Sequence, residues 1–213
     1  MYLCWSAKGG SGTTVFAAAL ALVMGQRRPT VLVDLDGDAP ATLGLAQPSG
    51  PGVAEWLASP SADALALANL TVPVTDGVEL LHRGGQLPAR PRWADLAHCL
   101  AQLERTVVID AGTGIPPLEL HHAAQQRLLV LRPCYLAVRR AVANGVQPTG
   151  LVVVHEPGRV LTARELSRVL NAPLVAEVDY DPNVARCVDA GLLSTRLPRP
   201  LAGQVSQSWR GAA

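Results

Sequence analysis

The chain has 213 residues, of which 49% are hydrophobic, and it carries a formal net charge of +1. This length and composition fit one globular domain and exclude a disordered chain. The near-neutral charge provides no general electrostatic attraction to nucleic acid or to an acidic membrane surface. No segment reaches the roughly 18 apolar residues that a membrane-spanning helix needs, so we expect no membrane span.

Six short apolar runs predict buried strands, at residues 2–7, 30–36, 106–112, 127–133, 150–156 and 173–179. Helical patterns lie between them, at residues 14–25, 92–103, 137–144, 162–170 and 182–190. Residues 40–76 are less regular, and we expect short helices there over the edge of the sheet. Strands that are apolar on both faces and alternate with helices predict a parallel sheet covered on both sides. The prediction is therefore one three-layer α/β domain over residues 1–213, with a mostly parallel twisted sheet flanked by helices.

Cysteine and histidine residues do not indicate a metal site. The sequence contains four widely spaced cysteines without a C-x-x-C pair: Cys4, Cys99, Cys134 and Cys187. This usage favours buried thiols over disulfides and indicates a cytoplasmic protein. His121 and His122 are adjacent, so they do not share a helical face, and we interpret them as a solvated helix start.

A glycine-rich turn joins the first predicted strand to the first helix and reads Lys8, Gly9, Gly10, Ser11, Gly12, Thr13, Thr14. Glycines allow successive N–H groups to turn inward around phosphate oxygens, and the helix N-terminus adds partial positive charge. The Thr14 hydroxyl stands where the last residue of a P-loop binds Mg²⁺. The turn therefore predicts a site for nucleotide phosphates; a strand-to-helix turn without a ligand is the alternative.

Lys8 is the only lysine in the sequence. The other residues among its 18 lysines and arginines are all arginine. A compact ammonium on a flexible stem suits a terminal phosphate in a tight loop better than the broad fork of arginine does. This usage supports a phosphate contact by Lys8.

The turn resembles the deviant Walker A motif of the ParA/MinD-type ATPases, which belong to the SIMIBI class of P-loop NTPases and read K-G-G-x-G-K-T/S-T. Two later segments match that family in order. VLVDLDGD, at residues 31–38, resembles its second acidic motif, and TVVIDAGTG, at residues 106–114, resembles its Walker B strand. YDPNVARCVDAGLL, at residues 180–193, resembles the segment that passes near the nucleotide base. The resemblance covers nearly the whole chain and is nearest to the CpaE/TadZ-like branch.

The resemblance implies ATP and Mg²⁺ as cofactors, with residues 8–14 around the phosphates. It implies that Thr14, Asp34 and Asp110 serve Mg²⁺, and that Asp36 positions the attacking water. Lys8 corresponds to the family's signature lysine, which reaches across a sandwich dimer to the partner's nucleotide. The implied protein is a homodimer when ATP-bound, has a protein partner, and regulates the placement or assembly of other components.

Thr13 departs from the motif because it replaces the ordinary P-loop lysine. Losing a charge-assisted contact costs about 1.5–3 kcal/mol where nothing substitutes for it, which is roughly a 10- to 150-fold loss of affinity. We therefore expect ATP binding with weak or absent hydrolysis.

Three alternatives stay open. The second half of the chain contains scattered arginines that a partition-type ATPase would use to bind DNA: Arg139, Arg140, Arg159, Arg164, Arg168, Arg186, Arg196 and Arg199. Acidic residues interleave with them, which favours a mixed, solvated surface over DNA binding. A scaffold that has lost nucleotide binding is the second alternative. A metabolic P-loop ligase is the third, although such enzymes usually need the lysine that Thr13 replaces.

Overall fold

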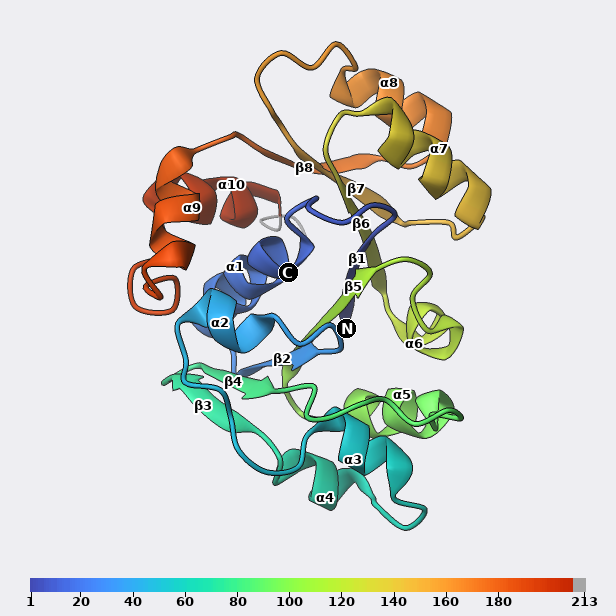
Figure 1. Cartoon of the computed structure of the whole chain (residues 1–213), viewed down its shortest axis with the longest axis vertical. Helices are drawn as coiled ribbons and strands as arrows, with labels where there is room; N and C mark the ends of the chain where they lie inside the picture. Colours follow the sequence, from blue (N-terminus) through green and yellow to red (C-terminus); the bar gives the residue numbers. More distant parts are fainter. Residues whose placement is uncertain (209–213) are drawn as a thin grey trace.

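Short runs of Val, Leu and Ile form the central sheet of the computed structural model, which describes residues 1–208 (Figure 1). In this part of the chain the strands are β1 (Tyr2–Ser6), β2 (Thr30–Asp34), β3 (Val72–Thr75), β4 (Val78–Leu81), β5 (Thr106–Thr113), β6 (Gln126–Leu131), β7 (Gly150–Val154) and β8 (Leu174–Val178). Their order across the sheet is β3-β4-β2-β5-β1-β6-β7-β8. All neighbouring strands are parallel except β3 and β4, which form an antiparallel hairpin. The predicted mostly parallel sheet is confirmed.

Helices cover both faces of this sheet (Figure 1). Those described are α1 (Thr13–Gly25), α2 (Ala39–Leu43), α3 (Val53–Ala58), α4 (Ala64–Ala68), α5 (Trp93–Ala101), α6 (Leu118–Ala123), α7 (Tyr135–Asn144), α8 (Ala163–Leu170), α9 (Pro182–Asp189) and α10 (Arg199–Ser208). One apolar core contains residues of α3, α5, α6 and α8, and the other contains residues of α1, α2, α9 and α10. Because the strands are apolar on both sides, each face requires such a cover. The three-layer prediction is confirmed.

The parallel strand directions determine where the candidate site lies. The adjacent strands β2, β5 and β1 are parallel, and their register pairs Asp34 with Asp110 and Cys4 with Asp110. The ends of these strands therefore lie together at one edge of the sheet. In open α/β sheets, ligands bind outside this carboxyl edge.

The four cysteines are free thiols: Cys4, Cys99 and Cys187 are buried and Cys134 is half-buried. This agrees with the prediction of free thiols, and with the prediction of burial for all but Cys134. The interpretation of His121 as part of a solvated helix start is wrong. His121 is only 5% exposed, its ring lies edge-on to Trp5, and its Nε2 is 3.1 Å from the carbonyl oxygen of Gln147. Of these two histidines, His122 is the exposed one.

None of the helices among residues 1–208 is both long enough and apolar enough to cross a membrane.

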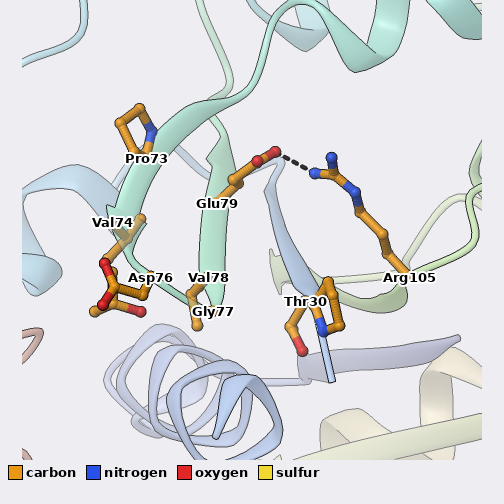
Figure 2. Close-up of a pocket in the computed structure, with 10 residues that line it drawn as sticks. Thr30, Pro73, Val74, Asp76, Gly77, Val78, Glu79 and Arg105 are labelled. Atoms are coloured by element: carbon orange, nitrogen blue, oxygen red, sulfur yellow. Dashed lines mark hydrogen bonds and ion pairs between the residues drawn. The ribbon is translucent and has the colours of Figure 1, made fainter. Parts of the chain in front are cut away.

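A hollow of about 580 Å³ lies at the opposite edge of the sheet, beside the β3–β4 hairpin (Figure 2). Glu79 of β4 and Arg105 face each other across it and form an ion pair. The Thr71 hydroxyl donates to the same carboxylate at 2.6 Å. This hollow lies at the amino ends of β2, β4 and β5, away from the edge where the acidic motifs end.

Candidate functional site

The glycine-rich turn between β1 and α1 adopts backbone conformations that favour glycine. Gly10 and Gly12 have φ angles of 74° and 91°, which side chains with a Cβ rarely adopt. Two hydroxyls fix the loop from inside, because Ser11 and Ser6 donate to the carbonyl oxygen of Lys8 at 2.6 and 3.1 Å. A Cβ at Gly10 would have no other atom within 4 Å, so the space beside the loop is open there.

The N-terminus of α1 has no side-chain cap. Gly12 occupies the N-cap position, where Ser, Thr, Asp or Asn would otherwise accept a hydrogen bond from the first turn. The first N–H groups of a helix have no partners within the helix, and they carry partial positive charge. This helix end therefore presents amide donors to an anion beside the glycine turn.

Asp34 ends β2 and is completely buried. Its Oδ1 accepts hydrogen bonds from the amides of Asp36 and Gly37 at 3.0 and 2.7 Å, and its Oδ2 accepts one from Ala39 at 3.2 Å. Burial raises its pKa and these amides oppose the rise. The carboxylate thus holds the turn that carries Asp36.

Asp36 lies against the end of β5. Gly112 has a φ of 64°, and a Cβ at this position would lie 2.4 Å from the Asp36 carboxyl carbon. Only glycine therefore leaves room for this side chain over the β5 backbone. On the other side of the turn, Arg83 donates from Nη1 to the main-chain oxygen of Asp36 at 2.9 Å.

Asp110 is completely buried at the carboxyl end of the sheet. Its Oδ1 accepts a hydrogen bond from the amide of Gly112 at 3.0 Å, whereas its Oδ2 has no partner at hydrogen-bonding distance. Burial raises its pKa to about 7, with further contributions from Asp34 and Asp36, and the neighbouring Thr14 hydroxyl and the Gly112 amide limit the rise. A buried oxygen without a partner beside two more carboxylates favours a cation.

Lys8 and Thr13 lie on the same loop in different surroundings. Lys8 is half-buried, and its Nζ is 3.4 Å from the carbonyl oxygen of Gly9. Its charge also lowers the pKa of Glu156, which follows β7, after the stronger effects of Arg159 and Arg132. Thr13 is buried at the first position of α1 and brings no charge to the loop.

A cavity of about 290 Å³ opens next to Gly12. Its walls are mostly apolar and come from α1, the ends of β7 and β8, and α9, including Val15, Phe16, Val154, Val178, Val184 and Val188. Tyr180, which is half exposed, and Asp181 lie on its rim with Arg132. Residues 180–189 therefore lie beside the first turn of α1.

The structure brings some of the predicted site residues together and leaves others with main-chain partners. Asp36, Asp110 and Thr14 meet next to the loop, whereas the oxygens of Asp34 are occupied by main-chain amides. Within residues 1–208, no group of three or more His, Cys, Asp or Glu residues is placed to hold a metal ion alone. The sequence analysis did not single out Gly112, which leaves room for Asp36, or Arg132, which lines the cavity beside Gly12. Arg132 could have been found from its place at the end of an apolar run, where Asp34 and Asp110 also stand.

Comparison with known proteins gives a match in structure alone. The sequence matches no family model, and no curated protein shows significant similarity to it. The structure resembles the septum site-determining protein MinD of Pyrococcus horikoshii OT3, complexed with Mg-ADP, with a TM-score of 0.75, 16% identity and coverage of 99% of this chain and 95% of that chain. It also resembles a ParA family ATPase from Chlorobium tepidum TLS, with a TM-score of 0.78, 18% identity and coverage of 98% and 96%.

The chain has the fold of the MinD and ParA ATPases. A third structure with this fold, a putative plasmid partition protein from Borrelia burgdorferi B31 bound to AMPPNP, covers the chain completely at 14% identity, with 99% of its own length covered and a TM-score of 0.74. The MinD/ParA fold thus extends over the whole described chain, and its glycine turn, acidic turn and β5 end converge at one edge of the sheet.

Proposed function

We propose that this protein binds ATP with Mg²⁺ and uses it as a switch for forming a homodimer, with weak or absent hydrolysis. The switch regulates the placement or assembly of a protein partner. Among MinD/ParA-type proteins, its loop sequence is nearest to the CpaE/TadZ-like branch. The observation that carries the proposal is the uncapped N-terminus of α1 beneath a glycine turn that faces Asp110.

The loop fits a nucleotide polyphosphate. Gly10 and Gly12 adopt the conformations that turn main-chain amides toward an anion, and the first turn of α1 adds its free N–H groups. Lys8 supplies the one charge that this loop brings to the phosphates. The neutral Thr13 removes a second charge, which weakens binding and transition-state stabilisation together.

The residues present also fit Mg²⁺. The unpartnered Oδ2 of Asp110 and the nearby Thr14 hydroxyl are oxygen donors of the kind this ion prefers, directly or through water. When bound, the ion neutralises phosphate charge. The ion would stabilise the charged form of Asp110, whose pKa is now raised chiefly by burial, and Thr14 would orient the ion at the start of α1. Asp34 acts one step away, because its amide hydrogen bonds position the Asp36 turn.

We assign to Asp36 the role of orienting an attacking water. Its carboxylate lies over Gly112 at the end of β5, in the group that includes Asp110 and Thr14. The apolar cavity beside Gly12 has a volume suited to a nucleobase, and Tyr180 on its rim provides an aromatic face.

Replacement of Lys8 tests the switch. Lys8→Ala is expected to abolish MgATP-driven dimerisation, because it removes the one ammonium available to reach a partner's nucleotide. The test is light scattering after size exclusion, with and without MgATP, beside calorimetric titration of MgATP and an assay of phosphate release. Arg27→Ala is the matched control, since it removes an exposed cation just beyond the other end of α1.

An ATP-dependent dimer in the wild type and the control, but not in Lys8→Ala, would support the switch. Undetectable binding of millimolar MgATP by the wild type would refute the nucleotide site. An unchanged mass with bound nucleotide would refute dimerisation alone.

A further inference from the structure

Arg132 stands directly after β6, the strand that runs next to β1. Their register pairs Trp5 with Leu129, so Arg132 follows β6 at the level where β1 passes into the glycine turn. On the other side, Leu131 pairs with Val153 of β7. Arg132 consequently lines the cavity that begins at Gly12.

The guanidinium of Arg132 is poorly satisfied by the protein. Its Nη1 makes one long contact of 3.4 Å with Glu156, and its buried Nε has no hydrogen-bond partner. Glu156 is bound more closely by Arg159, whose Nε donates to it at 2.7 Å. A buried donor without a partner is costly, and an arginine can give several hydrogen bonds to oxygens of one phosphate group. The side chain of Arg132 is 37% exposed, so a ligand can reach it.

The side chains around the loop carry more negative than positive charge, which favours an additional cation such as Arg132. Asp110 lies beside Thr14 of the loop and near the charges of Asp34 and Asp36. Thr13 is neutral, and Lys8 is the loop's own cation. We propose that Arg132 replaces the missing P-loop lysine by binding the phosphate chain of the nucleotide. This inference rests on the proposed function and adds a residue to its site.

The experiment measures MgATP and MgADP affinity by calorimetry. Arg132→Ala is expected to weaken both by at least about 10-fold, the loss of one charge-assisted contact, while Arg132→Lys retains most of the affinity. Arg159→Ala is the matched control: it removes the other guanidinium on Glu156 without touching the cavity, and it should change affinity only a few-fold. Glu156→Gln breaks the same ion pair from the other side and should not weaken binding.

A double-mutant cycle makes the replacement specific. Thr13→Lys should restore affinity to Arg132→Ala and improve the wild type much less, because the two cations serve the same phosphates. Thermal unfolding of each variant shows that its fold is intact. Three outcomes would overturn the inference and leave the nucleotide site standing. They are wild-type affinity in Arg132→Ala, equal losses of affinity in Arg132→Ala and Glu156→Gln, or a gain of affinity from Thr13→Lys that is the same in both backgrounds. Absence of nucleotide binding by the wild type would overturn both.

Discussion

Asp110→Asn is expected to stabilise the nucleotide-free protein at pH 8 and to abolish Mg²⁺-dependent nucleotide binding. Burial raises the pKa of Asp110 to about 7, so folding at pH 8 traps a carboxylate that would prefer to be protonated. A rise of about three pKa units corresponds to at most about 4 kcal/mol, and the new amide leaves part of its own hydrogen bonding unmet. We therefore expect a net gain of about 2 kcal/mol in the free energy of unfolding.

The pH dependence of stability gives the sign of this effect. Between pH 4 and pH 7 the folded Asp110 binds more protons than the unfolded one, so the stability of the wild type falls as pH rises through this window. Asp110→Asn should flatten the fall and give little gain at pH 4. Urea unfolding at several pH values in the presence of EDTA measures both. Asp38→Asn, which neutralises an exposed carboxylate of the same edge, is the control. An Asp110→Asn protein that is less stable at pH 8 than at pH 4, by the wild-type margin, would contradict the expectation.

Gly44→Ala is expected to lower the free energy of unfolding by about 2–5 kcal/mol. Gly44 ends α2 with a φ of 76°, and a Cβ there would lie 1.9 Å from the carbonyl oxygen of Gly191, just beyond α9. The left-handed backbone costs about 1–2 kcal/mol for alanine, and overpacking against main chain adds about 1–3 kcal/mol.

Gly50→Ala separates these two causes. Gly50 has a φ of 99°, but a Cβ at this position would have no other atom within 4 Å, so only the backbone cost applies. Urea unfolding of both variants should show a clearly larger loss for Gly44→Ala. Equal losses would mean that the approach of α2 to the segment after α9 contributes nothing to stability.

The sequence predicted the parts of the fold whose signal is local. Short apolar runs identified β1, β2 and β5–β8, and helical periodicity identified α1, α5, α7, α8 and α9. It did not predict β3 and β4, which have four residues each; β3 contains Pro73 and alternates between half-buried and exposed positions. It also missed α10, because Pro198 and Pro200 read as breakers, although a proline in the first turn of a helix is tolerated.

The candidate site divides in the same way. Lys8 and Thr14 lie in one short motif and Asp110 lies in another, and each motif follows or ends a predicted strand. Their convergence therefore follows from the order of the strands in a parallel sheet. The three amides on Asp34 come from the conformation of the turn after it, and the cavity beside Gly12 combines α1, β7, β8 and α9. Such groupings depend on tertiary packing and have no signature in a single stretch of sequence. His121 shows the same limit, since its burial depends on Trp5 and Gln147.

A chain with a single lysine has only two primary amines, the Lys8 side chain and the N-terminus. An acylating reagent that modifies side-chain amines can therefore modify only Lys8, and a lysine-specific protease can cleave only beside it. Mass spectrometry of the labelled or cleaved protein would report the state of this loop directly, without any engineered probe, and would show which small molecules shield it.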